Sequence, residues 1–123
     1  MARHDGKWES ARALLGAIPE TELQEAAESK NRTYCCGAGG GCFWKEEVGG
    51  TRINEHRLNQ LTRTNSETVA VGCPFCMTML EDAVKARSLE ETIRVRDLSE
   101  LMAEAIDPDP AANGAKTPGK QMV

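Results

Sequence analysis

Apolar residues recur at helical spacing in four segments of the chain, and short β-branched runs separate the later ones. The first segment runs from Trp8 to Ile18, where Pro19 ends it. The second covers residues 51–63, with a threonine that can cap it at its first position. The pattern therefore predicts helices over 8–18 and 51–63. Residues 22–26 carry too many charges to decide between a strand and further helix.

The second half of the chain alternates between strand-like and helix-like patterns. Residues 68–71 form a β-branched run that predicts a buried strand. Helical spacing follows over residues 74–87, and residues 92–95 predict another strand. Asp97 can cap a last helix over residues 98–106. This alternation predicts an α/β fold, with a small parallel sheet and flanking helices.

Composition sets the expected domain limits. The chain has 123 residues, which is the length of one small domain. Residues 107–123 hold three of the five prolines and almost no large apolar side chain, so they predict a disordered tail. We therefore expect a single domain over residues 1–106.

Charge and hydropathy exclude several classes of function. The net charge is -4 with the two signs interspersed, and no basic stripe indicates nucleic-acid binding. No segment approaches the roughly 18 apolar residues of a membrane helix, and no apolar signal region is visible. A cytoplasmic location is the expectation, with any membrane association provided by a partner.

The five cysteines carry the strongest chemical signal. Clustered cysteines in a reducing compartment indicate metal binding or thiol chemistry rather than structural disulfides. Cys73 and Cys76 form a CxxC motif between the predicted strand and the predicted helix. A helix N-terminus favours the thiolate, which is the form that binds metals. The carboxyl end of a parallel strand is also where open α/β sheets place their sites.

The CxxC motif alone leaves a dithiol redox site, half of a zinc site and a cluster-binding site open. The adjacent pair Cys35-Cys36 narrows the choice, because zinc sites favour cysteines two to four residues apart. An extended iron–sulfur cluster can instead use neighbouring thiolates on different irons. Four glycines among residues 37–41 predict a loop whose bare N–H groups can approach a cluster.

The spacing of the two cysteine motifs is specific. Counted from Gly37 to Gly72, 36 residues separate the Cys35-Cys36 pair from the CxxC motif. This pattern, with Arg-Ile-Asn at 52–54 and Asp-Leu at 97–98, resembles the cysteine-rich CCG domain. That domain occurs in heterodisulfide reductase subunits and in related iron–sulfur oxidoreductases, including glycolate oxidase iron–sulfur subunits. The resemblance covers roughly residues 3–106.

The resemblance implies an α/β domain with its cysteines at the C-terminal ends of strands. It implies a four-iron four-sulfur cluster, of cubane or non-cubane type, that serves electron transfer in a heterodisulfide reductase-like or 2-hydroxy-acid oxidase-linked oxidoreductase. Such a subunit is not expected to act alone, and its implied partners are flavoprotein or ferredoxin-like subunits. The ligands implied by the resemblance are Cys35, Cys36, Cys73 and Cys76.

Two departures from the family pattern keep alternatives open. The full pattern has a further cysteine well before the pair, and residues 1–34 contain none, so we expect an N-terminally incomplete domain. Cys42 lies outside the motif and is either a bystander or a substitute ligand. A metal-free thiol–disulfide protein using Cys73 and Cys76 and a non-catalytic zinc module remain the alternatives. No arrangement of serine, histidine and aspartate indicates a catalytic site.

Overall fold

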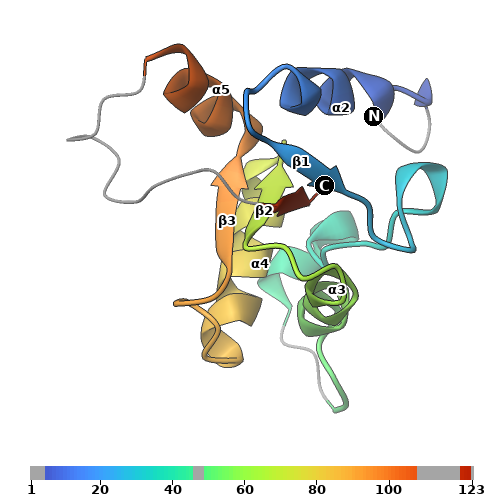
Figure 1. Cartoon of the computed structure of the whole chain (residues 1–123). Helices are drawn as coiled ribbons and strands as arrows, with labels where there is room; N and C mark the ends of the chain where they lie inside the picture. The colour runs from blue at the N-terminus through green and yellow to red at the C-terminus, as the bar shows by residue number, and fades with distance from the viewer. Residues whose placement is uncertain (1–4, 46–48, 108–119, 123) are drawn as a thin grey trace.

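The structure is a computed structural model that describes residues 5–45, 49–107 and 120–122 (Figure 1). Helices, strands and two short 3-10 helices, η1 and η2, alternate along it. In chain order they are α2 (Glu9–Gly16), β1 (Glu22–Gln24), η1 (Lys30–Arg32), η2 (Gly39–Trp44), α3 (Ile53–Thr62), β2 (Thr68–Val71), α4 (Pro74–Ala86), β3 (Arg94–Asp97), α5 (Leu98–Ile106) and β4 (Lys120–Met122).

The strands form one four-stranded sheet in the order β1-β4-β2-β3. Every pairing is parallel, and β2 lies in register with β3 so that Val69 is opposite Val95. Parallel neighbours need crossover connections, and the helices between the strands supply them. The predicted α/β class with a small parallel sheet and flanking helices is confirmed.

The two faces of the sheet carry unequal cores. Successive side chains of a strand point to opposite faces, so Val69 and Ala70 of β2 belong to different clusters. Figure 1 shows α3 and α4 on one side of the sheet and α2 with α5 on the other. The α3–α4 side holds the larger cluster: Ala26, Leu58, Leu61, Val69, Leu80, Ala83, Val84, Ile93 and Val95. The α2–α5 side is built on Leu15, Ala70 and Leu101.

The helices fall where the pattern predicts them, within a few residues at each end. Asp97 caps α5 as expected: it accepts a hydrogen bond from Ser99 N at 2.8 Å, and the Glu100 side chain accepts one from Asp97 N at 3.1 Å. This reciprocal pair is a capping box, which fixes the first turn of the helix.

One strand is displaced from its predicted limits. We expect a strand over 92–95, whereas β3 covers Arg94–Asp97. The backbone N–H groups of Thr92 and Ile93 both donate to the carbonyl oxygen of Leu89, at 2.9 and 2.8 Å. These bonds hold residues 92 and 93 in the turn after α4, so pairing with the sheet begins only afterwards. The undecided segment 22–26 contains the strand β1.

The predicted disordered tail lies mostly outside the described residues. Residues 108–119 and 123 are not described, but residues 120–122 form β4 between β1 and β2. These three residues pair through their backbone with strands on both sides, and disorder of the tail as a whole stays a prediction. No helix in the described ranges is long and apolar enough to cross a membrane.

Candidate metal centre

The CxxC motif lies at the junction between β2 and α4. Cys73 is the N-cap residue of α4 with an extended backbone, and Pro74 occupies the start of the helix. Proline suits that place because its missing N–H would have no helical acceptor there, and its φ already matches the helix. Cys76 follows within the first turn, where free N–H groups and the helix dipole favour negative charge on sulfur.

The Cys35-Cys36 pair lies in the loop between η1 and η2, not directly after a strand. Gly37 closes this loop with φ +100°, a conformation that favours glycine. A Cβ at Gly37 would lie 3.0 Å from Met79 Cε and 3.4 Å from Ile53 Cβ. The loop therefore packs directly on α3 and α4, and this close approach carries the cysteine pair to the CxxC motif.

The two motifs meet through their sulfur atoms. Cys76 Sγ donates a hydrogen bond to Cys36 Sγ over 3.2 Å, although 40 positions separate the two residues in the chain. Cys36 also interacts with the side chain of Cys35, and Cys76 with that of Cys73. The structure thus connects the four predicted ligand positions, which we call the sulfur group, in the order Cys35, Cys36, Cys76 and Cys73.

The hydrogen bond within the sulfur group shifts the pKa values of Cys36 and Cys76 in opposite directions. The hydrogen bond from Cys76, with further donation from the Ala38 backbone, lowers the pKa of Cys36 to about 6 against the opposing effect of burial. The pKa of Cys76 is raised, because Cys36 accepts its proton and because burial and neighbouring sulfur charges disfavour a second thiolate. Of the two thiols, Cys36 is therefore the one that loses its proton more readily.

Backbone donors also face the pair. Gly37 N donates to Cys35 Sγ at 3.3 Å. A Cβ placed on Gly39 would lie 3.6 Å from the same sulfur, so a glycine leaves the space beside it open. Cys35 is exposed, whereas Cys36, Cys73 and Cys76 are partly covered. The sulfur group is therefore reachable from solvent on the Cys35 side.

Asn54 joins α3 to α4 by a side-chain hydrogen bond. This role was not predicted from the sequence. The residue is 1 % exposed, and its Nδ2 donates to Met79 O of α4 at 2.9 Å. Its Oδ1 accepts a hydrogen bond from Glu55 N at 2.9 Å. The only signal in the sequence was its place in the family-like Arg-Ile-Asn segment.

The burial of Arg57 was also not predicted from the sequence. Arg57, one turn after Asn54 on α3, is 5 % exposed. Its positive charge interacts with the sulfurs of Cys36 and Cys76. An arginine on a charged helix is usually taken for a solvated side chain, so the sequence alone offered no means of finding it.

Aromatic rings border the site on the side of η2. Phe43 of η2 meets Phe75, which lies between the two CxxC cysteines, in an edge-on contact with ring centroids 5.3 Å apart. Trp44 stacks edge-on with Phe43 at 4.9 Å and is itself 83 % exposed. A separate contact joins His56 to Tyr34, with ring centroids 5.0 Å apart. Phe75, which is 54 % exposed, thus contacts η2 through the Phe43 ring.

Cys42 stands apart from the sulfur group. It lies within η2 and is partly exposed, and within the described ranges no hydrogen bond joins its sulfur to another side chain. Neither the bystander role nor the substitute-ligand role is decided by this placement, and both stay predictions.

The chemistry of the donors fits a cluster better than a single ion. Among the described residues, no three side chains of His, Cys, Asp or Glu converge to hold one metal ion. The 3.2 Å between the sulfurs of Cys36 and Cys76 matches a direct hydrogen bond in the metal-free chain. Four connected cysteines with backbone N–H donors are the donor set that iron–sulfur clusters use.

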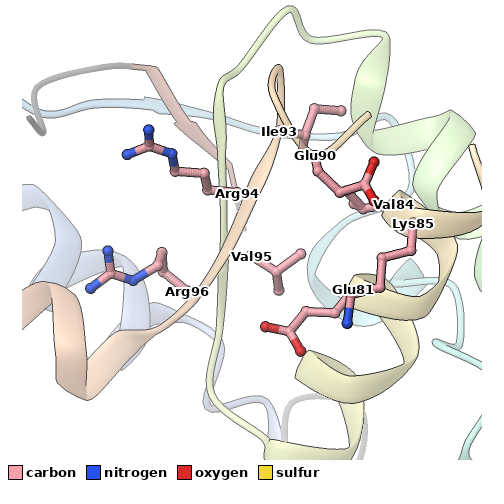
Figure 2. Close-up of a pocket in the computed structure, with 8 residues that line it drawn as sticks. All are labelled: Glu81, Val84, Lys85, Glu90, Ile93, Arg94, Val95 and Arg96. Carbon is pink, nitrogen blue, oxygen red and sulfur yellow. The ribbon is translucent and has the colours of Figure 1, made fainter. Parts of the chain in front are cut away.

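An open pocket lies elsewhere, between α4 and the edge strand β3 (Figure 2). Figure 2 shows Val95 directed toward α4, whereas Arg94 and Arg96 project to the opposite side of the strand. No cysteine lines this pocket, so it is not part of the candidate centre.

Comparison with known proteins identifies the family. The family model described as the CCG cysteine-rich domain matches residues 2–81. The chain belongs to this family. The family resemblance expected from the cysteine spacing is thereby confirmed for the cysteine-rich domain.

Several curated proteins are similar to this cysteine-rich domain. It is 39 % identical over 106 residues to the probable iron-sulfur-binding oxidoreductase FadF of Bacillus subtilis, covering 86 % of this chain and 15 % of that protein. It is 37 % identical over 114 residues to the EtfAB:quinone oxidoreductase of Syntrophomonas wolfei, covering 87 % of this chain and 16 % of that protein. It is 35 % identical over 106 residues to one of the subunits of the dihydromethanophenazine:CoB--CoM heterodisulfide reductase of Methanosarcina barkeri. That match covers 86 % of this chain and 25 % of that subunit.

The chain thus spans a quarter or less of the length of these relatives. A further relative, at 39 % identity over 115 residues, is named a probable membrane-anchored ferredoxin of Chromohalobacter salexigens; the match covers 94 % of this chain and 17 % of that protein. No solved structure matches the chain.

Proposed function

We propose that this cysteine-rich domain transfers electrons within an iron–sulfur oxidoreductase and that Cys35, Cys36, Cys73 and Cys76 hold its cluster. The observation that carries the proposal is the 3.2 Å contact between the sulfurs of Cys36 and Cys76, which joins two motifs distant in sequence. The relatives support it, because their names describe iron–sulfur-binding, quinone and heterodisulfide oxidoreductases.

The residues around the sulfur group suit an electron carrier. A bound iron–sulfur cluster supplies one-electron chemistry at a potential that its surroundings set. The N–H of Gly37 donates to Cys35 Sγ, and such bonds stabilise negative charge on a ligand sulfur. The first turn of α4 adds its positive dipole end beside Cys76. The exposed Cys35 gives the side on which a redox partner can come close to the site.

The finer assignments extend this proposal. We infer a cluster of the four-iron four-sulfur type, because four cysteine sulfurs are connected in one group. Flavoprotein or ferredoxin-like subunits are the proposed partners, in keeping with one relative named for EtfAB and quinone and another named a ferredoxin. The domain is proposed to work within a larger assembly, either heterodisulfide reductase-like or linked to 2-hydroxy-acid oxidation.

The test is a redox titration of the full chain after anaerobic reconstitution with iron and sulfide. Electron paramagnetic resonance follows the sample while dithionite and then ferricyanide change the potential. The proposal predicts a signal that appears and disappears reversibly with the addition and removal of one electron. A chain that binds iron but gives no reversible signal contradicts the electron-transfer function.

A thiol–disulfide function is the second candidate, and one observation favours a specific pair for it. The sulfurs of Cys36 and Cys76 lie 3.2 Å apart, and Cys76 also interacts with Cys73, its expected partner. Joining them would release two protons and two electrons to an added disulfide, which becomes two thiols. Oxidised glutathione is the probe: this candidate predicts reversible protection of Cys36 and Cys76 from alkylation in the metal-free chain. Unchanged alkylation after glutathione treatment excludes it.

A further inference from the structure

Arg57 is a buried cation, and its burial calls for a physical explanation. The residue is 5 % exposed, whereas every other arginine that the structure describes is partly or fully exposed. Removing a guanidinium from water is costly unless an opposite charge or several hydrogen bonds compensate. The question is therefore which group within the fold compensates this charge.

The hydrogen bonds of Arg57 leave its charge largely uncompensated. Its Nη1 donates to Glu28 O and to Gln60 Oε1, each at 3.0 Å, and both acceptors are neutral. Within the described ranges, no carboxylate forms an ion pair with it, and Nη2 and Nε have no protein acceptor. The Glu28 carboxylate attracts it only from beyond ion-pair distance.

The sulfur group supplies further negative charge, beside that of the Glu28 carboxylate, which attracts Arg57 most strongly. Asn54, three positions before Arg57 on α3, bonds to the backbone of α4, and residues three apart share a helix face. Arg57 therefore lies on the face of α3 that supports the CxxC helix. Its charge interacts with Cys36 and Cys76, the two residues whose sulfurs are 3.2 Å apart.

We propose that Arg57 tunes the centre through its ligands, its buried charge stabilising negative charge on the sulfurs of Cys36 and Cys76 and raising the reduction potential of the cluster they hold. The inference rests on the proposed function. Reduction adds one electron and hence one unit of negative charge to the group. A fixed cation nearby in a region of low dielectric favours that reduced form.

The test compares three variants of the full reconstituted chain in the same potentiometric titration. Arg57→Gln removes the charge and keeps a polar side chain, whereas Arg57→Lys keeps the charge. Arg63→Gln is the matched control, because Arg63 is an exposed arginine at the end of the same helix. Iron content and circular dichroism are measured on each sample before titration.

The inference predicts that Arg57→Gln lowers the ratio of reduced to oxidised cluster at a fixed potential about tenfold, which is about 59 mV for a one-electron couple. Arg57→Lys should titrate close to the unaltered chain, and Arg63→Gln should match it. Equal shifts in Arg57→Gln and Arg57→Lys would overturn the inference, because hydrogen bonding rather than charge would then be responsible. So would an Arg57→Gln shift no larger than that of the control.

A failure of folding, or of the proposed function, can be distinguished from a failure of the inference about Arg57. If Arg57→Gln takes up no iron, Arg57→Lys decides: a titration like that of the unaltered chain supports the inference, and a tenfold shift contradicts it. An unaltered chain without iron and labile sulfide refutes the proposed function, and the inference falls with it. An unaltered chain that titrates normally beside an unshifted Arg57→Gln refutes the inference alone.

Discussion

The two cysteine segments reach the same place by different structural means. The CxxC motif is built into regular structure, since β2 delivers Cys73 and the first turn of α4 delivers Cys76. The Cys35-Cys36 pair has no strand or α-helix of its own and lies between two 3-10 helices. It is held by the close packing of Gly37 on α3 and α4 and by a backbone hydrogen bond.

One half of the site is therefore specified by local sequence, and the other half by tertiary packing. A strand followed by a proline-initiated helix places the CxxC cysteines almost regardless of the rest of the fold. The loop half depends on contacts with α3, which packs on α4 through its core leucines and through the hydrogen bond of Asn54. The loop should therefore be more sensitive than the helix to changes far from the sulfurs.

The largest change in cluster absorbance is expected when a cysteine of the sulfur group is replaced, and Cys42, which lies outside that group, provides the comparison. Cys76→Ser removes the thiol that joins the two segments, so the reconstituted chain should lose the visible absorbance of a cluster. Cys42→Ser changes a cysteine outside the sulfur group and should keep most of that absorbance. Absorption spectra after anaerobic reconstitution check both. Similar loss in the two variants would make Cys42 a ligand.

The next largest effect concerns the packing of the loop. Gly37→Ala should destabilise the fold by about 3 kcal/mol, because it adds both a strained φ and an overlap with Met79. Gly40→Ala is the control: its φ is +65° but nothing lies within 4 Å of its Cβ, so the cost should be about 1 kcal/mol. Urea denaturation measures both. Equal costs would show that the close approach of Gly37 contributes nothing.

A moderate effect is expected where α3 meets α4. Asn54→Ala removes the donor to Met79 O in a buried place and should lower the free energy of unfolding by about 2 kcal/mol. Asn59→Ala, on the same helix but partly exposed, should change it by less than about 0.5 kcal/mol. Thermal or urea unfolding checks the pair. If Asn54→Ala lowered the free energy of unfolding no more than Asn59→Ala does, the Asn54 hydrogen bond would not stabilise the packing of α3 on α4.

The smallest effect is expected at the cap of α5, the helix on the α2–α5 side of the sheet. Asp97→Ala should cost about 1 kcal/mol through loss of the α5 cap and leave cluster uptake unchanged. Hydrogen bonds from the Ser99 side chain and backbone lower the pKa of Asp97, so its contribution is present above the unfolded pKa and fades as the pH falls through the folded one. Unfolding at neutral and acidic pH measures this. A cost that persists undiminished in acid would contradict the cap.

Local patterns were sufficient to predict one half of the site and much of the fold. The β-branched run, Pro74 and the helical spacing after it define the CxxC junction without reference to other segments. Asp97 and Glu100 likewise define their helix start, because capping depends on nearest neighbours in the chain.

The other features of the fold and of the site could not be predicted, because they depend on contacts between segments that are distant in the sequence. Asn54 and Arg57 are polar residues on a charged helix, and only the packing of α3 on α4 reveals that they are buried. The offset of β3 follows from turn hydrogen bonds to Leu89, and the strand β4 from pairing with β1 and β2. None of these features leaves a periodic trace in the sequence.

The most direct measurement of the central claim is the iron and acid-labile sulfide content of the full chain, isolated and kept without oxygen. Four cysteine sulfurs connected in one sulfur group predict a brown protein that contains iron and labile sulfide in near-equal amounts. A colourless protein that contains no labile sulfide, or one that holds zinc alone, would contradict the account.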